Sequence, residues 1–260
     1  MYFFDSHCHL DDPRFDPVRE GVLRRARERG VRELLIPGVS ASTWERTRDC
    51  CAATAGIYRA YGLHPYFLAE HREEDLAALE VWLDREKPVA LGECGLDFHR
   101  PDLDPARQTA LFRAQLSMAK DFGLPVIVHA RKALDRVTAE LSKFPGLGGV
   151  IHSFAGSEQQ AARLLDLGFK LGIGANIQYA RAQRLRRVVA SVALEGLLTE
   201  TDAPDQPGPN QRGHLNEPGH VVDVVAEIAA IRGLETRELA EITAANARQL
   251  FGLDRGALDV

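Results

Sequence analysis

The sequence has few cysteines and no segment long enough to cross a membrane. Its four cysteines, including the adjacent Cys50 and Cys51, form neither a secreted disulfide pattern nor a CxxC metal motif. No apolar run approaches the roughly 20 residues that span a bilayer, and no basic leader precedes an apolar stretch at the N-terminus. We therefore expect reduced thiols and a cytoplasmic protein that does not bind membranes.

Positive charge is also scarce. The 32 lysines and arginines are outnumbered by 37 acidic residues, which gives a formal net charge of −5. The densest arginine runs, at 24–29 and 181–187, have helical spacing and are typical of solvated helix faces. A protein without a basic stripe cannot easily hold a long duplex. If nucleic acid is the partner, we expect binding at a chain end, by a protein that is most simply a monomer.

Eight short apolar runs alternate with segments of helical spacing. The runs lie near Phe3, Leu35, Tyr58, Ala90, Val126, Val150, Leu171 and Leu198. Eight βα units match the (β/α)8 TIM barrel, an α/β fold of about 250 residues. No Pro/Gly/Ser-rich linker divides the 260 residues. We predict a single barrel domain over 1–260, with 203–218 forming a long loop over its mouth.

The clearest helix is predicted between Asp104 and Gly123. Asp104 can cap its start, Pro105 suits the first helical position, and Gly123 suits the C-terminal turn. Phe112 and Leu116 stand four residues apart and would share one apolar face.

Two histidines stand directly after the first apolar run. Because side chains alternate along a strand, His7 and His9 are expected to point the same way and Cys8 the opposite way. Two neutral imidazoles side by side can bind a divalent ion such as zinc, manganese or cobalt. Cys8 and Cys94 are expected to pack as small buried side chains, not as ligands.

Four more potential ligands follow later apolar runs: Glu93, His129, His152 and Asp202. Active sites of TIM barrels gather where the strands end, so all six ligands should converge there. Four imidazoles and two carboxylates are too many for one tetrahedral ion with an open position, and they suit two ions. We predict two divalent ions per chain, among Mg, Mn, Zn and Co, bridged by the two oxygens of Glu93.

Related binuclear barrels carry a modified lysine where this chain has Glu93. We expect no lysine close to the predicted ligands, which argues against a lysine-bridged amidohydrolase. No nucleophile motif of a serine or cysteine hydrolase occurs either.

Six short motifs in chain order carry a family resemblance: DSHCHL (5–10), GLHP (62–65), GECGLD (92–97), LPVIVHAR (124–131), HSFAG (152–156) and ETDAP (200–204). Together they resemble the TatD family of metal-dependent deoxyribonucleases. The resemblance implies a TIM barrel and a two-metal hydrolase. It also implies which residues hold each ion: His7, His9, Glu93 and Asp202 at one, and Glu93, His129 and His152 at the other.

The resemblance further implies a 3′–5′ exonuclease that cleaves phosphodiester bonds of single-stranded DNA, or RNA, with metal-activated water. Glu93 and Asp202 are then the catalytic residues, with Asp202 accepting the proton of the water. His64, His99 and Arg131 are the predicted substrate-binding residues, holding the phosphate or the terminal nucleotide.

The chain departs from the family at two places beside the expected mouth. Asp205 and Gln206 stand where members usually carry a large apolar or aromatic pair, and His99 replaces an aromatic ring. Two alternatives therefore stay open. In the first, the metal-activated water cleaves esters or lactones, or deacylates aminoacyl-tRNA. In the second, the protein is no enzyme but a metal-bound scaffold without chemistry.

Overall fold

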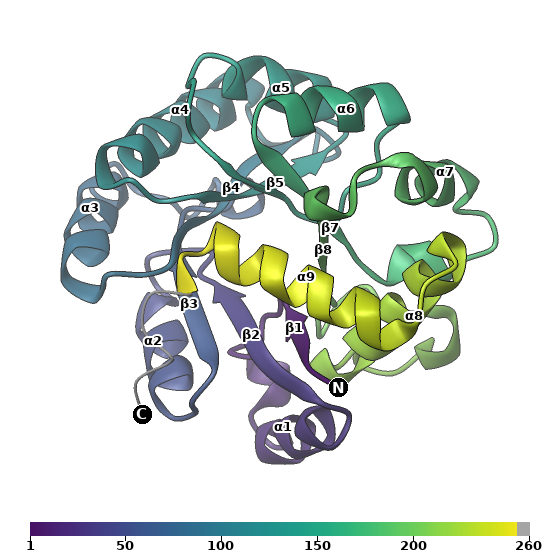
Figure 1. Ribbon diagram of the computed structural model, residues 1–260. Helices are drawn as coiled ribbons and strands as arrows, with labels where there is room; N and C mark the ends of the chain where they lie inside the picture. The colour runs from purple at the N-terminus through teal and green to yellow at the C-terminus, as the bar shows by residue number, and fades with distance from the viewer. Residues whose placement is uncertain (254–260) are drawn as a thin grey trace.

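The computed structural model describes residues 1–253 and shows a barrel of parallel strands (Figure 1). The eight strands lie side by side in chain order. Their bounds are β1 Phe3–Asp5, β2 Val31–Pro37, β3 Ile57–Tyr61, β4 Ala90–Asp97, β5 Val126–Arg131, β6 Gly149–Ile151, β7 Phe169–Ile173 and β8 Leu197–Thr199. The backbone N–H of Ser6 donates to the carbonyl of Thr199 at 3.0 Å, so the first and last strands also meet. The predicted TIM barrel and its eight predicted strands are confirmed.

Helices surround the strands (Figure 1). Within residues 1–253 the α-helices are α1 Arg19–Glu28, α2 Trp44–Ala52, α3 Asp75–Glu86, α4 Pro105–Phe122, α5 Leu134–Leu141, α6 Glu158–Asp166, α7 Gln183–Ser191, α8 Val221–Arg232 and α9 Thr236–Leu250. The predicted ends of α4 are confirmed, because Asp104 accepts from the N–H of Ala106 and Gly123 has a left-handed φ of 65°. No helix in this part of the chain is long and apolar enough to cross a membrane. Residues 254–260 of the predicted domain lie outside the described residues.

The barrel is closed by apolar packing at the end where its strands begin. Seven strands contribute one buried side chain each to a single cluster: Phe4, Leu35, Ala60, Ala90, Ile127, Val150 and Leu198. Ala244, Ala247 and Phe251, from α9 and its C-terminal end, complete the cluster. Figure 1 shows α9 lying across this end of the barrel. The barrel is therefore accessible from its opposite side, at the C-terminal ends of the strands.

Candidate metal centre

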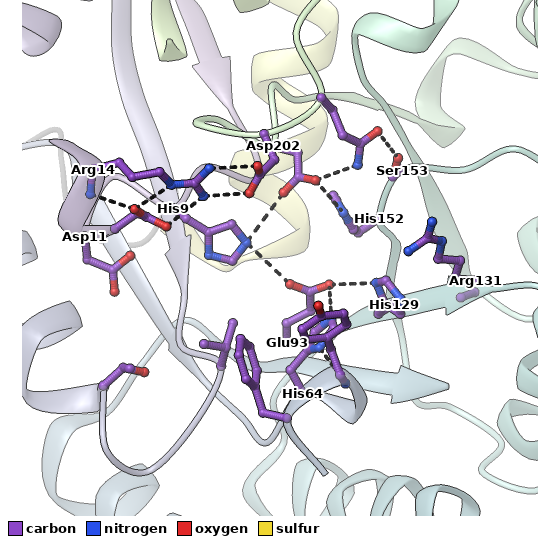
Figure 2. Close-up of a pocket in the computed structure, with 18 of the residues that line it drawn as sticks. His9, Asp11, Arg14, His64, Glu93, His129, Arg131, His152, Ser153 and Asp202 are labelled. Atoms are coloured by element: carbon purple, nitrogen blue, oxygen red, sulfur yellow. Dashed lines mark hydrogen bonds and ion pairs between the residues drawn. The ribbon is translucent and has the colours of Figure 1, made fainter. Parts of the chain in front are cut away.

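The predicted ligands meet at the mouth of the barrel, where the strands end: Figure 2 shows five of them, and the sixth, His7, lies 3.2 Å from Glu93. Two of them belong to β4 and β5, and the other four follow β1, β6 and β8: Glu93, His129, His7, His9, His152 and Asp202. All but the deeply buried His7 line one cavity of about 930 Å³. The structure therefore brings together every residue that the sequence proposed as a ligand.

Glu93 lies between two groups of imidazoles. Its Oε2 atom is 3.2 Å from Nε2 of His7 and 3.7 Å from Nε2 of His9. Its Oε1 atom is 3.1 Å from Nε2 of His64 and 3.2 Å from Nδ1 of His129. Each carboxylate oxygen therefore faces a different pair of histidines.

Asp202 contacts His7 and His9 as well, and it also lies near His152. Its Oδ1 atom is 3.6 Å from Nε2 of His7 and 3.5 Å from Nε2 of His9. Its Oδ2 atom is 3.6 Å from Nε2 of His152. His7, His9 and Asp202 thus offer two nitrogens and one carboxylate oxygen within 4.8 Å of one another, a donor set suited to a divalent cation.

The charges of these residues fit a metal centre. Glu93 and Asp202 form no ion pair with a lysine or arginine anywhere in residues 1–253. Buried charges are costly unless they are paired or bind metals. Three groups of ligand atoms, each within 4.8 Å, could hold an ion: His7, Glu93 and His152; His7, His9 and Asp202; His64, Glu93 and His129.

Both carboxyl groups are held in the charged form. Burial raises the pKa of Glu93, but its interactions with His64, His7 and His129 outweigh it and keep that pKa well below its usual value. Burial also raises the pKa of Asp202, and the charge and hydrogen bond of His152 outweigh it in the same way. Both side chains therefore remain negative at neutral pH and are able to bind cations.

Two further buried carboxylates lie beside the histidine rings. Oδ2 of Asp97 lies 3.2 Å from Nε2 of His129, and Oε1 of Glu200 lies 2.9 Å from Nδ1 of His152. The hydrogen bond with Asp97 sets the orientation of the His129 ring, whereas Nδ1 of His152 makes no hydrogen bond within the described residues. Burial lowers the pKa of His152, but the charges of Glu200 and Asp202 outweigh it and raise that pKa well above its usual value.

The sequence interpretation missed Asp97 and Glu200. Both belong to motifs that were recognised, as the last residue of GECGLD and the first of ETDAP. A carboxylate close to a ligand at a strand end was the available signal, because metal-binding histidines commonly donate their second ring N–H to such a group.

His64 contacts the ligand cluster instead of the outer part of the cavity. Its Nδ1 accepts from the backbone N–H of Tyr66 at 3.0 Å, and burial lowers the pKa of the ring to about 4 against the opposing charge of Glu93. The neutral ring then carries its proton on Nε2, which donates to Oε1 of Glu93 at 3.1 Å. This contact links His64 to Glu93, and His64 also lines the cavity, so its binding of phosphate stays a prediction.

The other two predicted substrate residues lie in different places. Arg131 lines the cavity (Figure 2). His99 is exposed and lies outside the residues that line the cavity, and its backbone N–H donates to Oδ1 of Asp97 at 2.9 Å. Lys132 lines the cavity beside Arg131. Lys132 belongs to none of the three ligand groups, so the expectation of no lysine close to the ligands stays a prediction.

Comparison with known proteins agrees with this geometry. The family model described as TatD related DNase matches residues 4–252. The uncharacterized metal-dependent hydrolase YjjV of Escherichia coli (strain K12) is 38% identical over 254 residues, which cover 96% of this chain and 98% of that protein. The crystal structure of YjjV, a TatD homolog, superposes with a TM-score of 0.92 over 96% of this chain and 98% of that one.

A relative with a named activity is also similar along nearly its whole length. The 3′-5′ ssDNA/RNA exonuclease TatD of Klebsiella pneumoniae (strain 342) is 35% identical over 262 residues, which cover 96% of this chain and 98% of that protein. The family match, the identities and the shared fold lead to one conclusion: this chain belongs to the family of TatD related DNases.

Proposed function

We propose that this metal-dependent hydrolase of the TatD family is a 3′–5′ exonuclease of single-stranded DNA or RNA, with two divalent ions per chain. One observation carries the proposal: the two oxygens of Glu93 face two separate groups of imidazoles at a mouth that opens into a large cavity. A single carboxylate placed between two sets of nitrogen donors is the arrangement expected of a bridging ligand.

The donor set divides naturally between two positions. His7, His9 and Asp202 would hold one ion with Oε2 of Glu93, and His129 and His152 would hold the other with Oε1. Bound divalent ions supply hydroxide near neutral pH and stabilise negative charge on phosphate oxygens. Asp97 and His64 keep the donor atoms of His129 and Glu93 turned toward these positions.

Asp202 is the proposed proton acceptor. Its carboxylate is ionised, and its Oδ1 atom faces the histidine pair at the inner end of the cavity. A carboxylate there can hydrogen-bond an attacking water and take up its proton.

The substrate class is inferred from the charges that line the cavity. Arg131 and Lys132 line it, and neither side chain forms a salt bridge or hydrogen bond with another residue in the described part of the chain. Two such cations can bind the phosphate groups next to the cleaved bond. A chain of net charge −5 offers few further phosphate contacts, which favours a substrate held by its end. The named activity of the Klebsiella relative supports the same class.

The experiment compares short single strands labelled at the 5′ or the 3′ end. Stepwise loss from the 3′ end, abolished by a chelator and restored by Mn²⁺, is the expected result. Parallel assays use bis(p-nitrophenyl) phosphate, p-nitrophenyl esters, lactones and an aminoacyl-tRNA. Cleavage of the ester or aminoacyl substrates without cleavage of DNA, RNA or the phosphodiester would favour the esterase or deacylase instead. Metal binding with no turnover of any substrate would favour the scaffold.

A further inference from the structure

The loop after β8 places an amide side chain against Asp202. Nε2 of Gln206 donates to Oδ2 of Asp202 at 2.5 Å. Oε1 of the same amide accepts from Oγ of Ser153 at 3.0 Å and from Nδ2 of Asn176 at 3.0 Å. Ser153 follows β6, and Asn176 belongs to the short helix η3 Ala175–Gln178 after β7. One amide therefore joins the loops that follow three consecutive strands.

These contacts fix which end of the amide faces Asp202. A primary amide has one acceptor oxygen and one donor nitrogen, and they lie on opposite sides of the group. Since the ionised carboxylate of Asp202 can only accept, the nitrogen must face it, and the oxygen then accepts from Ser153 and Asn176, which can both donate. The contacts with Ser153 and Asn176 then hold the amide in this orientation.

The backbone around Gln206 is anchored as well. The side-chain nitrogen of the buried Asn216 donates to the carbonyls of Asp205 and Gln206 at 3.0 and 3.3 Å. The hydroxyl of Tyr179 donates to the carbonyl of Pro207 at 3.0 Å. The side chain of Gln206 thus projects toward Asp202 from a segment held on both sides.

Asp202 needs such a constraint because its terminal torsion is soft. The χ2 angle of an aspartate is broad and nearly two-fold, so backbone packing alone does not hold the carboxylate plane. With Oδ2 hydrogen-bonded to Gln206, Oδ1 is the oxygen left facing His7 and His9. We propose that Gln206 is a positioning residue that locks the Asp202 carboxylate for metal binding and turnover, and this rests on the metal centre proposed above.

The test is titration of the metal-free protein with Mn²⁺ by calorimetry. Gln206→Met keeps the length of the side chain and removes its polar atoms. Loss of a group that orients a ligand typically weakens metal affinity by about 10- to 100-fold, and we expect a weakening in that range. The matched control is Gln211→Met, the same substitution in the same loop at a residue of similar exposure, which should bind Mn²⁺ as the parent does.

A second variant keeps the test independent of any loss of folding in Gln206→Met. Ser153→Ala removes one of the two donors that orient the amide, and one hydrogen bond corresponds to a loss of about threefold in affinity. With saturating Mn²⁺, kcat of both variants should fall, while KM for a short single strand stays close to the parent value. The thermal unfolding midpoint of the metal-free proteins should not change.

The outcomes separate this inference from the proposed function. Mn²⁺ affinities in both variants equal to the parent affinity would overturn the role of Gln206 and leave the metal centre intact. A parent protein that binds no Mn²⁺ would overturn the metal centre and, with it, this role.

Discussion

Nε2 of His7 lies 3.2 Å from Oε2 of Glu93, and both side chains are almost fully buried, with 1% and 3% of their surface exposed. Burial lowers the pKa of His7, and His152 lowers it further against the attraction of Glu93. The ring is thus biased toward its neutral form, which can donate a lone pair. A neutral imidazole and a charged carboxylate are both groups that can bind a divalent cation.

Glu93→Gln should therefore weaken metal binding at both proposed positions. An amide keeps the shape of the side chain but loses its charge and presents one oxygen instead of two. We expect a folded barrel with fewer than two tightly bound ions per chain, measured by elemental analysis after gel filtration. Glu33→Gln is the control, because Glu33 is also buried but pairs with Tyr58 and Arg248, away from the cavity. Two tight ions and full activity in Glu93→Gln would show that Glu93 is no bridge.

Much of the fold could be predicted because parallel strands of a barrel are buried on both faces. Such strands appear as short continuous apolar runs, and the runs around Leu35 and Val126 are examples. The convergence of ligands followed from the barrel alone, since equivalent strand ends must meet at one mouth. The exact bounds of the strands could not be predicted from the sequence, because β1, β6 and β8 contain only three residues each, too few to show a pattern.

The parts of the site that sequence could not predict depend on side-chain direction. His64 precedes a proline, and only the structure shows that its Nδ1 is occupied by the Tyr66 N–H. His99 was expected at the cavity, but it follows the end of β4 and its side chain is exposed outside the lining residues. The contact of Gln206 with Asp202 depends on two other loops, which no local pattern describes.

Asp202→Asn should abolish turnover while at least one ion remains bound. Asparagine can still offer an oxygen to a metal, but it cannot accept the proton of a water. We expect kcat on a 3′-labelled single strand to fall by more than about 100-fold, as general base catalysis contributes on that scale. Metal content is measured on the same sample. Activity within about tenfold of the parent, or ~1.4 kcal/mol in the barrier, would exclude Asp202 as the essential base.

Glu140 on α5 should make stability depend on pH in acid. Arg113 and Lys143 donate hydrogen bonds to its carboxylate and lower its pKa from 4.5 to about 2, although burial acts to raise that pKa. A carboxyl group whose pKa is lower in the folded state stabilises the fold above pH 4.5, and this contribution disappears as the pH falls toward 2.

Glu140→Gln should accordingly lower the free energy of unfolding near pH 7 by on the order of 1–2 kcal/mol, since its cationic partners are half exposed. The difference from the parent should shrink between pH 4.5 and 2, as followed by urea unfolding at several pH values. Glu241→Gln removes an exposed pair with Arg237 and serves as the control, with little effect expected. A difference that is the same at pH 7 and pH 2.5 would contradict this assignment.

Binding of nucleic acid should depend only weakly on salt. Of the arginines that line the cavity, Arg14 is paired with Asp12 and Asp205, and Arg46 with Asp16. Arg131 and Lys132 are the lining cations left for phosphate in the described part of the chain. Each phosphate neutralised on a single strand contributes about −0.7 to the slope of log affinity against log salt, so two or three contacts give roughly −1.5 to −2.

The measurement uses the Asp202→Asn protein and a short single strand at several salt concentrations, with metal held constant. Arg131→Gln in that background should reduce the magnitude of the slope by about 0.7, whereas Arg237→Gln on α9 should leave it unchanged. The active enzyme is tested in parallel on linear and circular single-stranded DNA. If the substrate is held by its end, only the linear strand is shortened, because a closed circle offers no terminus to the cavity. A slope near −5, or efficient cutting of the circle, would rule out end trimming and indicate a longer binding track outside the mouth.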